Sequence, residues 1–146
     1  MKTHPAFAIL KALKSAFPNA VVHPLDVDYA LLTEFAWHNT HRLFAHSMFQ
    51  QGLPEWLAEK GDCDDWAWLL RGYVIRRNWH QSESRVPVAI FYLHYTTRQG
   101  IVHAINCAVV RRGDNLAVLP IEPQPHQGGP FEMTTEERAS VTLVIG

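Results

Sequence analysis

The chain has 146 residues, and its 13 Lys and Arg nearly balance its 14 Asp and Glu. This length is enough for one domain with a buried core, so we expect a single domain over residues 1–146. The charge balance lacks the basic excess typical of proteins that bind nucleic acid. No apolar run approaches the roughly 18 residues that a membrane span needs. We therefore expect a soluble protein with neither a nucleic acid nor a membrane as its partner.

The two cysteines, Cys63 and Cys107, can form at most one disulfide, which excludes a scaffold held together by disulfides. We expect both to be free thiols. The sequence contains no CxxC, HExxH, Walker, GxGxxG or GxSxG pattern, so the commoner metal, nucleotide and serine-hydrolase sites have no support in it.

The first part of the chain, about residues 1–80, predicts three helices. Apolar side chains recur at helical spacing over residues 5–17, and two lysines interrupt this segment, which favours an amphipathic helix over a secretory signal and hence a cytoplasmic protein. A second helix is expected to begin after Asp26 or Asp28 and to end before Gly52. The third begins at Asp62 or Cys63 and runs to about Asn78.

After residues 80–87 the pattern changes to β-branched and aromatic runs, which form the sheet part, about residues 86–146. The segments "VPVAIFYLHYT", "IVHAINCAVVRR" and "NLAVLPIEP", separated by the turns "RQG" and "GDN", predict three antiparallel strands, and "VTLVIG" predicts a fourth. A helical turn is expected after Thr134 or Thr135. Helices followed by strands indicate an α+β fold, with N-terminal helices packed on one side of a C-terminal antiparallel sheet of about four strands.

The stretch "GDCDDWAW" places Cys63 in the first turn of the third helix. A helix N-terminus favours a thiolate through its unpaired N–H groups, so Cys63 is a candidate nucleophile. The alternative is that Asp62, Asp64 and Asp65 cap a helix whose cysteine packs inward. The spacing from Cys63 to Ala67, Leu70 and Val74 places the cysteine on the packed stripe of that helix.

The strands supply two partners for such a thiol. His103 begins one predicted strand, and Glu122 ends the next, between Pro120 and Pro123, which keep the backbone extended. In an antiparallel pair the end of the second strand lies beside the start of the first, so the two side chains can approach each other. Cysteine, histidine and acid in this order are typical of a triad in which the histidine takes the thiol proton and the acid orients the imidazole.

Over about residues 50–125 the segments "GDCDDWAWLLRG", "HAINCAVV" and "IEPQ" resemble the papain-like cysteine peptidase domain of fungal agglutinins of the Marasmius type and related small phage and bacterial proteins. The resemblance implies a papain/transglutaminase-like fold, with Cys63 as nucleophile, His103 as base and Glu122 as the third member of the triad. It also implies a peptide or protein substrate, and a protein made in a bacterial or phage-infected cell.

The same resemblance implies a metal site beside the cysteine. The members of that family depend on calcium, so Asp64, Asp65 and Glu122 become candidate ligands, and hard oxygen ligands suit Ca²⁺ or Mn²⁺. Capping of the helix remains the alternative interpretation of both aspartates.

Other polar residues carry weaker expectations. Asn106 or Gln124 could contribute to an oxyanion hole with the backbone N–H of Cys63. The hole stays unassigned, because the glutamine of papain-type enzymes is missing at the usual short distance before the cysteine, and Gln50 and Gln51 are remote alternatives. Trp56 is associated with the cleft in the resembling family, although packing between helices is its ordinary role. His38, His41 and His46 do not share one helical face, so we expect surface or packing residues, and Cys107 is expected to be an inert core thiol.

The functional hypothesis is a thiol hydrolase, a cysteine peptidase or amidase that works through a covalent acyl-enzyme and depends on calcium. An acyltransferase of the transglutaminase type would use the same residues. The competing hypothesis is a non-catalytic phage or bacterial interaction or structural protein with the same fold.

Overall fold

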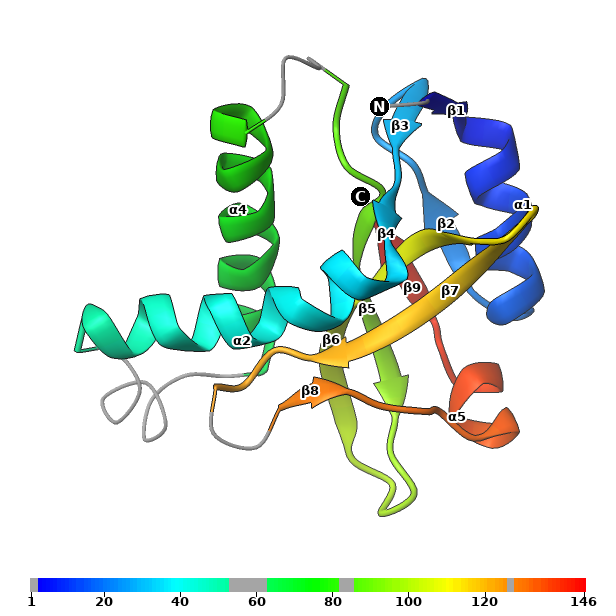
Figure 1. The fold of residues 1–146 in the computed structure, drawn as a ribbon. Helices are drawn as coiled ribbons and strands as arrows, with labels where there is room; N and C mark the ends of the chain where they lie inside the picture. The colour runs from blue at the N-terminus through cyan, green and yellow to red at the C-terminus, as the bar shows by residue number, and fades with distance from the viewer. Residues whose placement is uncertain (1–2, 53–62, 82–85, 126–127) are drawn as a thin grey trace.

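The computed structural model describes residues 3–52, 63–81, 86–125 and 128–146 (Figure 1). Its four helices in these ranges are α1 (Ala6–Ala16), α2 (Glu34–Gln50), α4 (Cys63–Gln81) and α5 (Thr135–Ala139). The strands are β1 (Thr3–Pro5), β2 (Val21–His23), β3 (Asp28–Ala30), β4 (Leu32–Thr33), β5 (Ile90–Thr96), β6 (Val102–Arg112), β7 (Asn115–Glu122), β8 (Gly129–Pro130) and β9 (Leu143–Ile145).

Within the described ranges, a mixed sheet of seven strands forms the centre of the molecule. Six strands follow the order β2-β9-β5-β6-β7-β8. The seventh strand, β4, pairs with Val110 and Arg111 of β6. The long central strands are antiparallel, with Cys107 opposite Phe91 on β5 and opposite Pro120 on β7. The β2–β9 and β4–β6 pairs are parallel, while β1 and β3 form a separate two-stranded ribbon.

Helices cover both faces of the sheet, because the side chains of the central strands alternate between two apolar clusters. Ile9, Leu13 and Phe17 from α1 and the residue that follows it pack against odd-numbered residues of β6, such as Ile105 and Val109. The opposite cluster joins α2 and α4 to the even-numbered side chains of β6. Figure 1 shows α1 on one side of the sheet and α2 and α4 on the other.

The predicted fold class is wrong in three respects: the sheet has seven strands rather than four, it is mixed rather than antiparallel, and helices lie on both of its faces. The N-terminal part is not only helical, since it contributes β2 and β4. These strands are two or three residues long, too short for a periodic pattern. Their partners lie far away in sequence, as in the pair Val21–Leu143, so local sequence does not reveal them.

The predicted second helix starts too early. Thr33 rather than Asp26 or Asp28 is its N-cap, and the Thr33 side chain accepts a hydrogen bond from the Ala36 N–H at 3.0 Å. The preceding residues are extended because Ala30 donates to Pro87 O and accepts from Ala89 N–H, at 2.8 and 2.9 Å. Tertiary pairing overrides the helical pattern there.

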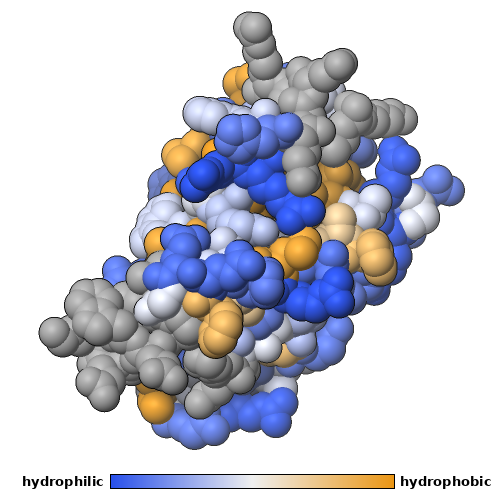
Figure 2. Space-filling view, turned by 60° about the vertical axis from the view of Figure 1, so that its left-hand side comes forward, coloured by the Kyte–Doolittle hydropathy of each residue, from blue (hydrophilic) through white to orange (hydrophobic). Residues whose placement is uncertain are grey.

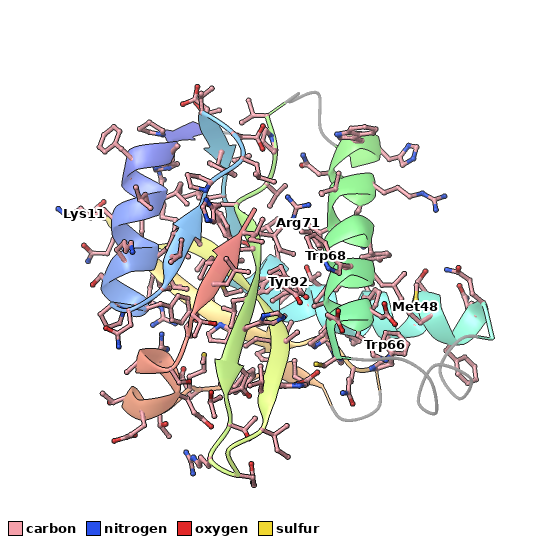
Figure 3. All side chains as sticks on the ribbon, turned by 180° about the vertical axis from the view of Figure 1, so that it is seen from behind. Lys11, Met48, Trp66, Trp68, Arg71 and Tyr92 are labelled. Carbon is pink, nitrogen blue, oxygen red and sulfur yellow. The ribbon has the colours of Figure 1, made fainter. Side chains whose placement is uncertain are left out.

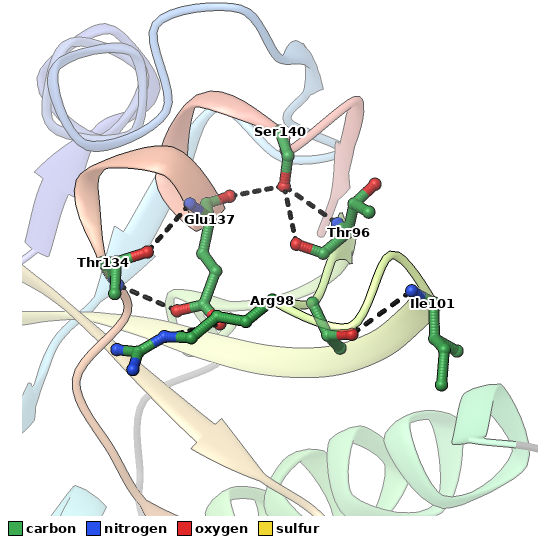
Figure 4. Close-up of polar contacts among 7 residues, drawn as sticks. Thr96, Arg98, Ile101, Thr134, Glu137 and Ser140 are labelled. Carbon is green, nitrogen blue, oxygen red and sulfur yellow. Dashed lines mark hydrogen bonds and ion pairs between the residues drawn. The ribbon is translucent and has the colours of Figure 1, made fainter.

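The other long elements follow the sequence pattern closely. The first and third helices and the three predicted antiparallel strands occur where expected, and the predicted turn after Thr134 is α5. Thr134 and Glu137 form a reciprocal capping box at its start, and Ser140 at its end accepts from Thr96 N–H at 2.8 Å, which ties α5 to β5 (Figure 4).

Candidate functional site

The predicted triad residues lie at the end of the sheet where β7 leaves β6. The last register pair between these strands is Asn106–Ile121, so Glu122 and His103 lie just beyond it. Their side chains meet, with His103 Nε2 at 2.5 Å from Glu122 Oε2, and both are about four-fifths buried. The structure therefore brings these two predicted residues together as expected from the antiparallel pairing.

Cys63 reaches the same end of the sheet from α4. It is partly exposed, and its Sγ accepts a hydrogen bond from the backbone N–H of Ala104, the residue after His103, at 3.3 Å. This contact places the sulfur beside the strand residue that follows His103. The stripe predicted for α4 is confirmed, since Ala67, Leu70 and Val74 are buried.

Tyr95 lies beside this group on β5. Its ring contacts the His103 ring edge to face, with centroids 5.8 Å apart. Burial is the main cause that raises the pKa of Tyr95 to about 12, and the negative charges of Glu137, Glu122 and Cys63 add to it. Tyr95 is therefore a neutral hydroxyl at neutral pH, and it closes one side of the group.

Glu122 is held from both sides. Its Oε1 accepts the backbone N–H of Gln124 at 3.2 Å, while Oε2 faces His103. Gln124 O in turn contacts Nε2 of His41 on α2 at 2.9 Å. His41 is buried, in keeping with the packing role predicted for it, but no sequence pattern indicates that it reaches the loop after Glu122.

The predicted metal ligands do not form a cluster in the described ranges. No group of three or more His, Cys, Asp or Glu in these ranges is arranged to hold a metal ion. Asp64 is partly exposed, Asp65 is exposed, and both oxygens of Glu122 already have partners. Trp56 and Asp62 lie outside the described residues. A Ca²⁺ or Mn²⁺ site at Asp64, Asp65 and Glu122 stays a prediction.

The oxyanion hole predicted beside Cys63 also stays a prediction. Asn106 is fully buried, and its Oδ1 has no hydrogen-bond partner within the described part of the chain. Gln124 uses its backbone N–H and C=O to hold Glu122 and His41. Cys107 behaves as the inert core thiol we expected, because burial raises its pKa far above the ordinary value.

A separate open pocket of about 910 Å³ lies between α2 and α4. Its lining combines aromatic, cationic and small polar side chains: Ser47, Met48, Gln51, Asp65, Trp68, Leu69, Gly72, Tyr73, Arg76, Arg77 and His80. Figure 2 brings this side of the molecule forward and shows apolar surface interspersed with hydrophilic side chains. Sequence reasoning missed this pocket, because it needs the packing of two helices.

Trp68 is an aromatic group of that pocket whose ring is held in place by its neighbours. The ring stacks on Tyr92 of β5 with centroids 4.7 Å apart and planes inclined by 12°, and the Arg71 guanidinium lies 5.8 Å from the ring centre. Figure 3 shows Arg71 and Trp68 pointing from α4 toward Tyr92. Trp68 nevertheless remains 44% exposed, so a fixed aromatic surface faces solvent.

No family model matches the chain, and no curated protein sequence matches it. Among solved structures, the chain is similar to that of a PSL1a-E64 complex, with 17% identity and a TM-score of 0.71 over 99% of this chain and 51% of that one. It is also similar to a Polyporus squamosus lectin bound to the human-type influenza-binding epitope Neu5Aca2-6Galb1-4GlcNAc, with 19% identity and a TM-score of 0.73 over 99% and 49%. The chain spans about half the length of these neighbours, and identities this low show a shared fold alone.

These comparisons contradict the predicted membership of a papain-like cysteine peptidase family, and with it the assignment as a thiol hydrolase. No peptidase family matches the sequence, and one of the two structural neighbours is a lectin bound to a glycan. The three short motifs misled because they specify an order of residue types and not a family. The papain/transglutaminase-like label for the fold is corrected on the same ground.

The comparisons also bear on the predicted partners. The similar lectin binds a glycan rather than the peptide or protein that we expected, and neither neighbour is described with a nucleic acid or a membrane. Within the described ranges, none of the helices combines the length and the apolar character of a membrane span. The cytoplasmic location stays a prediction.

Proposed function

We propose that this chain binds a carbohydrate, without catalysis, in the pocket between α2 and α4. The observation that carries the proposal is the partly exposed Trp68, held flat against Tyr92 at the side of an open pocket. The apolar face of a sugar ring can pack on such an indole, and an aromatic group that is already fixed loses little conformational entropy on binding. The glycan bound by the similar lectin supports this class of ligand.

The polar lining fits hydroxyl-rich and anionic sugars. Gln51 and Asp65 offer hydrogen-bond groups for hydroxyls, and Arg76 and Arg77 bring two positive charges against the single charge of Asp65. Arginine binds carboxylates through two parallel hydrogen bonds, so a sugar acid would gain more than a neutral sugar. We therefore expect acidic glycans to bind more tightly than neutral ones.

A glycan array followed by calorimetry on the strongest hits tests this function. Trp68→Ala should weaken binding roughly five- to tenfold, since one aromatic contact contributes about 1–1.4 kcal/mol. Trp79→Ala is the matched control, because Trp79 lies on the same helix, is 75% exposed and does not line the pocket. Arg76→Ala should selectively weaken the binding of acidic glycans. Arg42→Ala should not, because Arg42 is an exposed residue of α2 outside the pocket lining. An array without binding, or equal loss in Trp68→Ala and Trp79→Ala, would overturn the proposal.

A second candidate function concerns the group formed by Cys63, His103 and Glu122. The geometry of this group favours a reactive Cys63 thiol. We propose that His103 takes the Cys63 proton and that Glu122 stabilises the resulting imidazolium, so that Cys63 is a nucleophilic thiolate. The contacts that support it are the His103–Glu122 pair and the N–H of Ala104 on Cys63 Sγ. The reactive group is the thiol of Cys63, and its substrate stays open.

Labelling with iodoacetamide and with an epoxide at neutral pH tests the thiol, with glutathione as the reference. Cys63 should react at least tenfold faster than the reference thiol, and His103→Ala should reduce the rate to the reference value. Cys63→Ala should abolish labelling, and Cys107→Ala should leave it unchanged. A wild-type rate equal to that of glutathione would remove this candidate.

A further inference from the structure

The α2 helix lies along the edge of β7 and satisfies backbone carbonyls on and just after that strand. Trp37 Nε1 donates to Leu119 O, and one helical turn later His41 Nε2 contacts Gln124 O, each at 2.9 Å. Both rings are buried. Because β8 is only two residues long, these side chains take over the partner role that a longer neighbouring strand would have.

The His41 contact fixes the residue that holds the carboxylate of Glu122. A carbonyl oxygen only accepts, so Nε2 of His41 carries the proton and donates it to Gln124 O. The N–H of the same Gln124 points the other way, to Glu122 Oε1 at 3.2 Å, and Glu122 Oε2 meets His103. One continuous chain of contacts therefore runs from α2 through the loop to the imidazole.

Gly128 lies very close to the backbone of Glu122 and Gln124 and to the ring of His41. A Cβ atom at this position would lie 2.2 Å from Gln124 O, 2.3 Å from Glu122 O and 2.7 Å from His41 Nε2. These distances are far below normal contact, so the returning chain has room only for glycine. Gly128 therefore lies directly beside the hydrogen bond between His41 and Gln124, and a side chain at this position would disturb that bond.

We infer that His41 is a positioning residue for the group formed by Cys63, His103 and Glu122. It acts through Gln124, holding the loop so that Glu122 keeps one oxygen on His103. The inference rests on the reactive thiol proposed above. It gives α2, on the same face of the sheet as α4, a direct connection to that group.

The test compares His41→Phe, which removes the donor and keeps a ring, with His41→Gln, whose amide can donate from a similar distance. The first readout is hydrogen exchange of the Gln124 amide, which depends on the loop alone. The second is the pH profile of Cys63 labelling by iodoacetamide. Trp37→Phe is the control, because it removes the neighbouring hydrogen bond of α2, one turn away, without touching Gln124.

We expect His41→Phe to speed exchange of the Gln124 amide and to slow Cys63 labelling at neutral pH, each by about tenfold, and to move the labelling profile toward higher pH. His41→Gln should keep both properties near wild type, and Trp37→Phe should lower stability without moving the profile. Gly128→Ala should reproduce His41→Phe. Unchanged Gln124 exchange in folded His41→Phe would overturn the inference, as would a profile that shifts equally in Trp37→Phe.

The two readouts separate the inference from the proposal on which it rests. The labelling rate of the wild-type protein decides whether Cys63 is reactive. Exchange of the Gln124 amide decides, whatever that rate is, whether His41 holds the loop beside Glu122. A reactive wild-type thiol with an unaltered rate in His41→Phe would leave the thiol proposal standing and remove the role of His41.

Discussion

Replacement of Trp37 by Phe tests how α2 is attached to the sheet. Trp37 is fully buried, and its indole N–H is the hydrogen-bond donor to Leu119 O. The variant keeps an aromatic ring in the cluster and removes the donor, which leaves a buried carbonyl without this partner. Trp37→Phe therefore removes one hydrogen bond and makes a small change in side-chain volume.

The expected cost has two parts. A buried acceptor left without its partner costs about 1–3 kcal/mol, and the smaller ring leaves a cavity worth roughly 1 kcal/mol. Trp37→Phe should thus lower the free energy of unfolding by about 2–4 kcal/mol. That loss is a large fraction of the roughly 5–15 kcal/mol typical of a domain.

Urea unfolding followed by far-ultraviolet circular dichroism measures this difference without relying on tryptophan fluorescence. Trp79→Phe is the control at a position that is 75% exposed, and it should change stability by less than about 0.5 kcal/mol. If Trp37→Phe lies within about 0.5 kcal/mol of the wild type at an unchanged slope, the hydrogen bond does not anchor α2 and the reasoning fails.

Three further predictions concern individual side chains. In the folded protein, peptide mapping should find iodoacetamide on Cys63 and not on Cys107, because burial raises the pKa of the Cys107 thiol; modification of both at equal rates would contradict this. The hydrogen bond from Arg112 lowers the pKa of Glu34 below 4.5. The stabilisation that this pair contributes is therefore present above that pH and is lost as the pH falls below it. The destabilisation measured for Arg112→Ala at about pH 7 should accordingly shrink at about pH 3. Millimolar Ca²⁺ should raise the midpoint of thermal unfolding and Asp64→Asn should remove that rise, whereas no rise in the wild type would count against the predicted metal site.

The meeting of His103 and Glu122 was predictable from the sequence because an antiparallel hairpin is a local structure. A short turn fixes its register, and the register places the end of one strand beside the start of the other. The packed stripe of α4 was predictable for a similar reason, since helical spacing alone decides which side chains share a face. Both inferences use residues that are close in sequence.

The family, the activity and the sheet order did not follow from such local patterns. The motifs around Cys63, His103 and Glu122 suggested a peptidase, whereas the solved structures that share the fold include a lectin, and no family model supports the peptidase interpretation. Three short motifs specify the order of residue types and leave the overall fold and ligand open.

The sequence by itself determined the first and third helices, the central antiparallel strands and the inert character of Cys107, since each depends on periodicity or on burial that the apolar pattern indicates. Only the tertiary structure decided the parallel pairing of β2 with β9, the pocket beside Trp68 and the contact between His41 and Gln124. These features join residues up to about 120 positions apart, and their free energy comes from packing that exists only after the chain has folded.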